Sequence, residues 1–413
     1  MVDEWKKARI EEVAEKVGMG PFGSSIKVET FVPKGIPVIS GQHLHGTRLE
    51  DKEYNFISLE HGEKLKNANV FRGDIIFTHA GNIGQAAYIP ETSKYERYII
   101  SQRQFYMRCD KTKVLPGFVT RYFKTAEGRH KLLANASSVG VPSLARPVSY
   151  LRTIEIPIPP LHEQKTITKI FDAFDDKIEL NRRMNQTLEA IAQAIFKSWF
   201  IDAIQSGLPK GWRKGPILEL AKLMSGGTPK TNRKEYWDGD ILWASAKDVS
   251  QCGQTFLVTT ERTITTKGLD ESTTQMIPAF CTVVVARGAT TGRMILFGRN
   301  MAMNQTCYAL ATTTGTPFAL YCMIRHEMSD LVQSAHGSVF DTITTSTFAS
   351  QNIALPPKEL LQQFEQTVTA LFQRALTNTE ESRTLATLRD TLLPKLISGE
   401  LRVKDAEKFS RAG

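Results

Sequence analysis

The sequence that decides the fold is LHEQKTITKIFDAFDDKIELNRRMNQTLEAIAQAIFKSWF, residues Leu161–Phe200. It contains no glycine or proline, and its apolar side chains recur every three or four positions, which is the spacing of an amphipathic helix. The stretch follows Pro159-Pro160, and proline suits the first turn of a helix while the residue before it is extended. The sequence therefore predicts one long helix, about 60 Å at ~1.5 Å per residue.

The predicted helix carries an apolar seam that one asparagine interrupts. The seam residues are Ile167, Phe174, Asn181, Leu188 and Ile195, and a second row is expected three residues after each, at Ile170, Lys177, Met184, Ile191 and Ser198. An asparagine at a buried seam position costs stability but fixes the register of paired helices. The pattern therefore favours pairing with another helix.

A second stretch of the same kind follows Pro356-Pro357. Its seam residues are Phe364, Leu371, Asn378, Leu385 and Leu392, each 197 positions after its counterpart, and its second row is Val368, Ala375, Ser382, Arg389 and Leu396. Both pairing directions are possible on length, and we expect an antiparallel coiled coil because it puts the two globular blocks at opposite ends. The plainer alternative is a core helix inside each domain, and a binding face for a partner helix is a further, compatible use.

The globular segments before the two helices repeat one another. The matching stretches are Ile36–Leu44 with Ile241–Val249, Asp74–Gly84 with Thr282–Gly292, and Ile154–Pro160 with Gln351–Pro357. They keep their order at nearly constant offsets, which indicates a domain duplication. Short β-branched runs in each block predict strands, with helical patches between them. We therefore expect an α+β fold, with two duplicated mixed α/β domains separated by two long helices.

Charge distinguishes the blocks from the helices. Of the formal net charge of +9, residues 1–160 contribute +6 and residues 204–355 contribute +3, against −1 and +1 in the two helical segments. Excess positive charge favours an anionic partner, and nucleic acid is the usual one. A 60 Å helix would be a rigid spacer of nearly two DNA turns, each about 34 Å.

Motifs for catalysis are missing from the sequence. The string Gly18-x-Gly20-x-x-Gly23 fits a dinucleotide pattern, but Pro21 lies inside it and no strand is expected before it. Patterns for a phosphate loop, a catalytic zinc, a serine nucleophile or amino-methyl transfer do not occur. The five cysteines are scattered and no signal peptide or membrane span is visible, which favours a reducing cytoplasm. We expect no catalytic site, cofactor or metal.

Polar side chains on the duplicated loops are the candidates for DNA contact, because such groups read base edges and loops on a rigid scaffold carry recognition. In the first block they are Lys27, Gln42, His43, His79, Asn82, Gln102, Arg103 and Arg146. In the second block they are Lys230, Lys247, Arg287, Thr290, Arg293, Asn304, Gln305 and His336. Any one of them can instead be an ordinary solvated or turn residue.

The tips of the duplicated loops differ between the blocks. The repeat places His79 with Arg287 and Asn82 with Thr290, so the scaffold recurs while the polar groups change. A duplicated protein that reads two different halves of a DNA site would need different polar groups on the two sets of loops.

The order of block, double proline and long helix, repeated once, resembles the specificity subunit of Type I restriction-modification systems. The strings that carry the resemblance are Pro159–Ile167, Ala190–Phe200, Leu392–Val403 and the loop Gly288–Gly292, from which Ala80–Gly84 departs slightly. The likeness covers essentially the whole chain and is most specific in the helices.

The resemblance implies two target recognition domains (residues 1–158 and 204–355), two conserved helices (159–203 and 356–403) and a tail (404–413). Each domain would read one half of a gapped DNA site. The helices would set the gap and dock two modification (methyltransferase) subunits, and restriction (motor-nuclease) subunits would join the larger complex. S-adenosylmethionine and ATP would belong to those partners, and this chain would be non-catalytic. The alternatives are a scaffold that joins proteins through its seams and an enzyme with an unfamiliar site.

Overall fold

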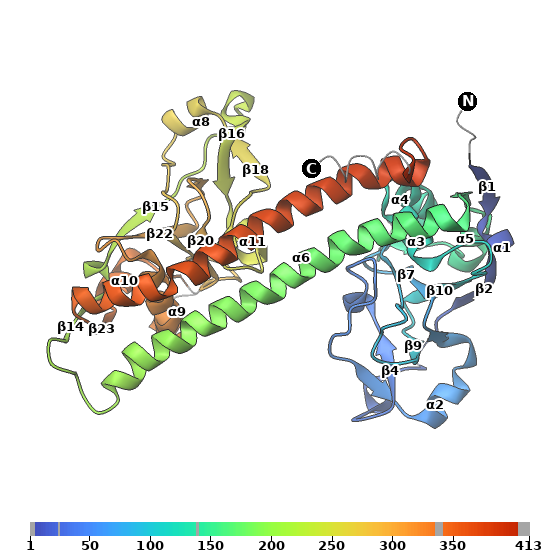
Figure 1. Ribbon diagram of the computed structural model, residues 1–413, viewed down its shortest axis with the longest axis horizontal. Coiled ribbons are helices and arrows are strands. Elements are labelled where there is room, and N and C mark those ends of the chain that lie inside the picture. Colours follow the sequence, from blue (N-terminus) through green and yellow to red (C-terminus); the bar gives the residue numbers. More distant parts are fainter. Residues whose placement is uncertain (1–4, 24, 138–139, 335–341, 404–413) are drawn as a thin grey trace. The chain divides into compact units, whose positions relative to one another are not determined.

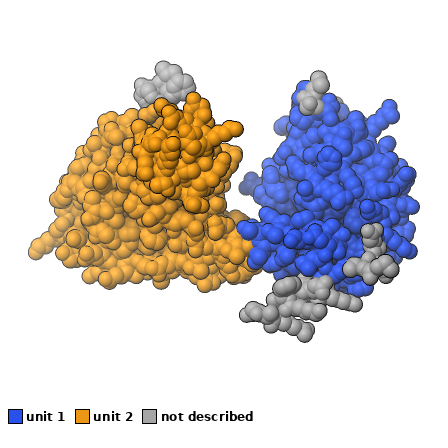
Figure 2. All heavy atoms as spheres, turned by 90° about the horizontal axis from the view of Figure 1, so that it is seen from above, with its two compact units in different colours: residues 1–175, 386–413 blue, residues 176–385 orange. Residues whose placement is uncertain are grey.

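The structure is a computed structural model that describes residues 5–23, 25–137, 140–334 and 342–403. The chain divides into two compact units, coloured separately in Figure 2. Unit 1 comprises Met1–Asp175 with Ala386–Gly413, and unit 2 comprises Asp176–Leu385. These units do not follow the segment borders expected from the sequence, because each contains one globular block and the parts of both long helices that pack against it.

Unit 1 is built on two sheets. A four-stranded antiparallel sheet has the order β2 (Ala14–Met19), β10 (Gln104–Cys109), β7 (Asp74–Thr78) and β8 (Ala86–Tyr88). A five-stranded sheet has the order β3 (Phe31–Val32), β5 (Asn55–Ile57), β4 (Ile36–Ile39), β9 (Arg97–Ile100) and β6 (Asn69–Phe71). Two smaller pairs are β1 (Lys6–Arg9) with β13 (Glu155–Ile158) and β11 (Ala136–Ser137) with β12 (Ser143–Leu144).

The core of unit 1 includes residues that follow unit 2 in the sequence. The short helices of this unit are α1 (Ile10–Val13), α2 (Leu59–Lys64), α3 (Pro116–Lys124), α4 (Ala126–Leu133) and α5 (Pro147–Thr153). Leu396, Ile397 and Val403 are buried in the same cluster as side chains of the four-stranded sheet. The guanidinium of Arg402 lies over the ring of Trp5, 4.8 Å from its centroid. The last described residues therefore complete the domain that the first residues begin.

Unit 2 repeats this plan with different strand lengths. One sheet has the order β15 (Ala221–Ser225), β22 (Cys307–Thr312), β19 (Thr282–Val285), β20 (Met294–Phe297) and β17 (Phe256–Leu257). The other has the order β18 (Arg262–Ile264), β16 (Trp237–Ala244) and β21 (Ala302–Met303), and β14 (Arg213–Pro216) pairs with β23 (Asn352–Leu355). The short helices are α7 (Ala246–Gln251), α8 (Thr266–Asp270), α9 (Pro317–Ser334) and α10 (Thr345–Ser350).

Strand pairing confirms the duplication. In unit 1, β4 runs parallel to β9 with Val38 opposite Ile99, and in unit 2, β16 runs parallel to β21 with Trp243 opposite Ala302. In both units one strand of the main sheet lies between the first strand of that sheet and a third strand. The orders are β2-β10-β7 in unit 1 and β15-β22-β19 in unit 2. The two blocks thus share one topology.

Two long helices, α6 (Leu161–Phe196) and α11 (Lys358–Ser398), run in opposite directions (Figure 1). In unit 1, Asp175 accepts a hydrogen bond from Arg389 at 2.9 Å, and Glu163 accepts one from Arg402 at 3.2 Å. A residue later in α6 therefore contacts a residue earlier in the C-terminal segment, as antiparallel pairing requires. The antiparallel coiled coil is confirmed, and a π-turn over Lys197–Ile201 ends α6 just before the predicted end.

The second row of the α6 seam differs from the expected one. Phe171, Asn185 and Ala192 are buried, whereas Ile191 is 43% exposed. The buried row thus lies four residues after each seam residue and not three. Spacings of three and of four residues both bring a side chain to the same side of a helix. The correct row is hard to recognise in the sequence because two of its members, Asn185 and Ala192, are not large apolar residues.

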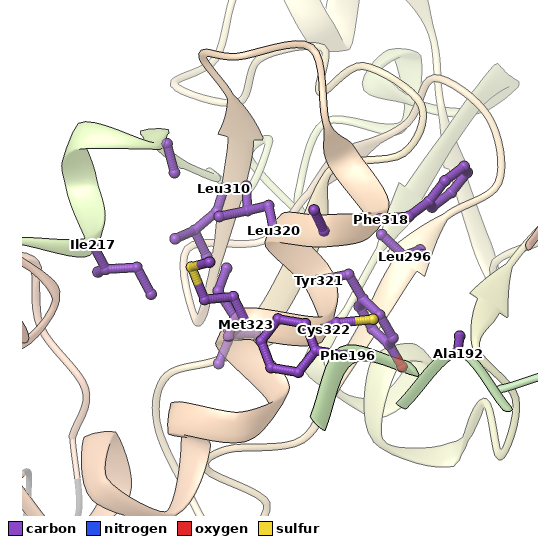
Figure 3. Packing of buried hydrophobic residues seen from close by; sticks show 14 of the residues in the cluster. Ala192, Phe196, Ile217, Leu296, Leu310, Phe318, Leu320, Tyr321, Cys322 and Met323 are labelled. Carbon is purple, nitrogen blue, oxygen red and sulfur yellow. The ribbon is translucent and has the colours of Figure 1, made fainter. Parts of the chain in front are cut away.

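The seam residues themselves lie between the helices to different depths. Ile167, Asn181, Phe364 and Asn378 are buried, and Phe174, Leu188, Ile195, Leu371, Leu385 and Leu392 are half-buried. In unit 2, Ala192 and Phe196 of α6 meet Tyr321 and Cys322 of α9 in the main core (Figure 3). The long helix is therefore part of the domain core as well as of the coiled coil.

A polar layer interrupts the seam in unit 2. The amide of Asn185 donates to the carbonyl of Ala375 at 3.1 Å and to the hydroxyl of Thr379 at 3.0 Å, and its oxygen accepts from the amide of Asn378 at 2.9 Å. Asn181 donates to the carbonyl of Asn378 at 3.3 Å. The layer can be satisfied only when these turns of the two helices stand opposite each other, so it specifies register.

Asn185→Ala is expected to lower the free energy of unfolding by about 2 kcal/mol, because it leaves buried polar partners on α11 without hydrogen bonds. Gln186→Ala, at the exposed neighbouring position, is the matched control and should change stability by less than about 0.5 kcal/mol. Urea unfolding of the two variants measures the difference. Equal stability of both would show that the polar layer does not hold the helices in register.

Each block is also held to α6 or α11 by polar groups. In unit 1 the side chain of Gln164, fully buried, accepts from the backbone N–H of Leu115 at 2.8 Å and donates to the carbonyl of Pro159 at 2.8 Å. In unit 2 the carboxylate of Glu365 accepts from the N–H groups of Phe318 and Ala319. In both units a long helix thus satisfies the first backbone donors of the helix that follows the main sheet.

A buried ion pair fastens α3 to α6 in unit 1. The Arg121 guanidinium is 2% exposed and donates to Asp172 at 2.7 Å and to Asp175 at 3.2 Å. Arg121→Met should lower the free energy of unfolding by roughly 3 kcal/mol, because it leaves the partly buried Asp172 carboxylate without its cation and leaves Asp175 with Arg389 alone. Lys64→Met breaks an exposed pair with Glu60 and should cost less than about 0.5 kcal/mol. Chemical denaturation that ranks the two variants equally would contradict this assignment.

No helix among the described residues is long and apolar enough to cross a membrane. Within the same residues no group of three or more histidine, cysteine or acidic side chains is arranged to hold a metal ion.

Candidate nucleic-acid interface

Three loops of unit 1 meet at one end of the four-stranded sheet. The N–H of His79, just after β7, donates to the carbonyl of Arg103 at 2.9 Å, and the carbonyl of His79 accepts from the N–H of Leu144 at 2.8 Å. The N–H of Gly81 donates to the carbonyl of Pro142 at 2.9 Å. Backbone hydrogen bonds therefore hold the loop after β7, the loop before β10 and the β11–β12 hairpin together.

The polar tips of these loops face solvent. Asn82, Gln102 and Arg103 are exposed, whereas His79 is half-buried with its Nε2 3.0 Å from the carbonyl oxygen of Gln102. Burial lowers the pKa of the His79 imidazole below its usual 6.5. The ring is therefore neutral at pH 7, and it braces the loop by donating Nε2–H to that carbonyl. The exposed side chains of Asn82, Gln102 and Arg103 remain around it.

Gln42 belongs to the same surface. The N–H of Ser101 donates to the carbonyl of Ile39 at the end of β4, at 3.0 Å, which brings the turn after β4 beside the loop before β10. Gln85 fixes this turn, because its amide donates to the carbonyl of Gly41 at 3.1 Å while its oxygen accepts from the hydroxyl of Thr78 at 3.1 Å. Gln85 was not among the predicted site residues, and no local pattern in the sequence marks it, since its role depends on two distant segments meeting.

The corresponding loops of unit 2 are joined in the same way. The N–H of Ala286 donates to the carbonyl of Thr306 at 2.8 Å, and its carbonyl accepts from the N–H of Ile343 at 2.9 Å. The N–H of Asn304 donates to the carbonyl of Ala244 at the end of β16, at 2.9 Å. Arg287, Thr290, Arg293 and Gln305 are exposed on these loops. One loop frame therefore occurs twice and carries different side chains.

The comparisons with known proteins follow this repeat. A family model described as the Type I restriction modification DNA specificity domain matches residues 2–190 and again residues 209–388. The chain belongs to this family. Each match includes one globular block and much of the long helix after it. The family gives the chain a role in DNA sequence specificity, and recognition, not catalysis, is the task of such a subunit.

Curated relatives of this specificity subunit extend over most of its length. It is 24% identical to the specificity subunit of the Type I restriction enzyme HindI of Haemophilus influenzae, over 80% of this chain and 87% of that one. It is also 24% identical to the MjaIX specificity subunit of Methanocaldococcus jannaschii, over 97% of this chain and 94% of that one. The crystal structure of the Type I restriction-modification S subunit from M. genitalium shares the fold, with a TM-score of 0.58 at 16% identity over 96% of this chain and 97% of that one.

The loop equivalence predicted for this specificity subunit is wrong by one residue. In the hydrogen-bonding pattern His79 corresponds to Ala286, and Ala80, which bridges Ser143, corresponds to Arg287, which bridges Thr342. The two left-handed glycines that bound the loop are Gly81 and Gly84 in unit 1 and Gly288 and Gly292 in unit 2. The second loop is therefore one residue longer, which sequence matching without the strand register could not place.

His43 is a second correction. It is 1% exposed, stacks on Tyr54 with ring centroids 4.5 Å apart, and has its ring nitrogens 3.0 Å from the N–H of Ser40 and 3.2 Å from the carbonyl of Glu53. Burial lowers the pKa of its imidazole. His43 is therefore a structural residue that shapes the turn and cannot reach DNA, because its polar atoms are used inside the domain.

The remaining candidates lie in varied settings. Asn304 uses its side-chain oxygen to accept from Thr306 at 2.8 Å, and Lys247 is exposed but paired with Glu261 at 2.7 Å. Exposed positions are occupied by Lys27, Lys230 and Arg146, and His336 lies outside the described residues. Lys27 is on the turn before β3, where its backbone N–H and carbonyl both hydrogen-bond with the Thr30 side chain.

Proposed function

We propose that this chain reads a two-part, gapped DNA sequence, with unit 1 contacting one half and unit 2 the other. The observation that carries the proposal is the repeated loop frame. Each unit holds three loops together by equivalent backbone hydrogen bonds, while the exposed groups are Asn82, Gln102 and Arg103 in one unit and Arg287 and Thr290 in the other. Amide and guanidinium groups are suited to bidentate contacts with base edges.

The long helices would set the gap and dock the partners. Leu180 and Ile191 on α6 are 46% and 43% exposed, and Leu388 on α11 is 47% exposed. Apolar side chains that remain exposed on paired helices suit a protein partner. Two modification (methyltransferase) subunits would bind there and carry S-adenosylmethionine. Restriction (motor-nuclease) subunits would join in the full complex and carry ATP.

Substitution of the loop tips tests the proposal. Gln102→Ala with Arg103→Ala should relax sequence preference in one half of the site only, and Arg287→Ala with Thr290→Ala should relax it in the other half only. Loss of a good base contact costs ~1–3 kcal/mol, so discrimination at the affected positions should fall by roughly 5- to 150-fold. Selection of duplexes from a random library by the complex with its modification subunits measures both halves at once.

Lys210→Ala, an exposed lysine outside the loop frame, is the control and should leave both halves unchanged. Relaxation of both halves by one pair of substitutions would contradict the assignment of one unit to each half. A scaffold that only joins proteins would show no salt-dependent binding of any particular duplex.

A further inference from the structure

Unit 1 has a groove beside the edge strand β2 that its loop frame does not include. The groove has a volume of about 1140 Å³ and is lined by Ser25 and by three segments that are distant in the sequence, Lys16–Phe22, Lys64–Ala68 and Arg146–Ser149. Four of the lining residues are cations and none is acidic, while Val17, Met19 and Pro21 supply an apolar floor. We propose that this groove holds the sugar–phosphate backbone of the DNA whose bases the adjoining loops read. This inference rests on the proposed function and adds a phosphate-binding site to it.

The groove continues directly into the loop frame. The N–H of Gly20 donates to the carbonyl of Gln104 at 2.9 Å, and a Cβ at Gly20 would lie 2.3 Å from the carbonyl oxygen of Ser101. Only glycine lets the backbone approach the loop before β10 so closely. At its other side, Arg146 follows the β11–β12 hairpin that is hydrogen-bonded to His79. DNA seated on the loops would therefore meet the groove without a break.

The glycine string of the sequence is explained by this geometry. A strand, β2, does precede it, contrary to the expectation, but the string lines the edge of a sheet and not a turn between a strand and a helix. A Cβ at Gly18 would lie 2.5 Å from the Tyr106 ring. Gly226 in unit 2 has the same close approach, 2.2 Å from the carbonyl oxygen of Asn304. Gly18 and Gly20 therefore serve close packing beside the loops, whereas Gly23 has a left-handed φ of 61° and open space around it.

Charge in the groove is largely uncompensated. Within the described residues, neither Lys66 nor Arg146 has a carboxylate at ion-pair distance, and Lys16 contacts only the Tyr106 ring, 5.9 Å from its centroid. Lys64 pairs with Glu60 at 2.7 Å on the surface, where such pairs contribute little. Cations spread along an open groove suit a chain of phosphates, whose binding releases counterions.

The backbone of Arg146 supports the assignment. Its φ of 45° is in the left-handed region, which costs a residue with a side chain roughly 1 kcal/mol or more. The conformation directs the chain from the hairpin into α5 and leaves the guanidinium exposed at the groove. A strained residue that presents a free cation to a groove is typical of a binding site.

The test uses the double variant Lys66→Ala, Arg146→Ala in the complex with its modification subunits. Binding of the cognate duplex is measured at several salt concentrations. Two lost phosphate contacts should reduce the slope of log K against log salt by about 2, at ~0.9 per phosphate, and should weaken binding roughly tenfold or more near physiological salt. Sequence preference in both halves should be unchanged, because phosphate contacts position the protein without reading bases.

Lys7→Ala, Lys34→Ala is the matched control, since it removes the same charge from exposed positions of unit 1 outside the groove and should leave the slope unchanged. Lys66→Arg, Arg146→Lys keeps the charge and should retain the wild-type slope. An unchanged slope in the alanine double variant would overturn the groove proposal, and so would a changed preference at one half. Absence of specific binding by the wild-type complex would instead overturn the proposed function.

Discussion

Replacing residues 1–158 with the corresponding block of another family member should change one half of the recognised DNA sequence completely and leave the other half unchanged. An exchange that ends at Ile158 keeps the strand pair of β1 and β13 intact, because both strands lie inside the exchanged segment. The loop frame of unit 2 is untouched by the exchange. Sequencing of methylated positions in cells that carry the chimera measures the outcome.

Two polar contacts with α6 lie across the border, beside the apolar packing of Leu396 and Ile397, and bear on whether such a chimera folds. Gln164 binds the backbone at Leu115, and Arg121 binds Asp172 and Asp175 on α6. A donor block with an arginine at the position of Arg121 should give a stable chimera. The reciprocal exchange of residues 204–355 is the control and should change the other half alone. A change in both halves after either exchange would disprove the assignment.

Four residues inserted into each long helix, between Asp175 and Asp176 in α6 and between Leu385 and Ala386 in α11, should lengthen the gap of the DNA site. Four helical residues add ~6 Å, which corresponds to one or two base pairs at ~3.4 Å each. These points are chosen because Ala192, farther along α6, is fully buried in the core of unit 2, where an insertion would rotate Phe196 out of place. Both half-site sequences should stay the same.

A four-residue insertion after Gly207, in the connection between α6 and β14, is the matched control for the longer helices. Gly207 and Leu208 are exposed there, so the insertion leaves the coiled coil intact and should leave the gap as it was. A variant with lengthened helices that still binds DNA at the original gap would rule out the helices as its determinant.

The parts of the fold that could be predicted depend on patterns local in the sequence. The helix over Leu161–Phe196 follows from its missing glycines and prolines, the second helix follows from its matching apolar spacing although it contains Pro394, and Asn181 and Asn378 align the two because a polar seam residue is conspicuous. The second row was expected at Ile170 and the structure buries Phe171 instead, because spacings of three and of four residues both face the same side of a helix. The sequence left both pairing directions open, and the contacts of Asn181 with Ser382 and of Asn185 with Ala375 establish the antiparallel one.

The candidate interface was less predictable, because burial and strand register depend on distant segments. The turn that holds His43 looks polar in sequence, yet Tyr54 covers the ring. Arg287 was matched to His79 because nothing in the sequence marks which loop has the extra residue. The groove lined by Lys16, Lys66 and Arg146 joins three separate segments and has no local signature.

The burial of Leu396, Ile397 and Val403 in the core of unit 1 has a consequence for synthesis of the protein. A ribosome makes the chain from its N-terminus, and domains generally fold as units while it does so. Unit 2 is continuous from Asp176 to Leu385, whereas the segments of unit 1 lie on both sides of it in the sequence. Unit 1 therefore cannot complete its core until the residues that follow unit 2 have been synthesised, and part of its apolar surface stays uncovered while unit 2 is being made.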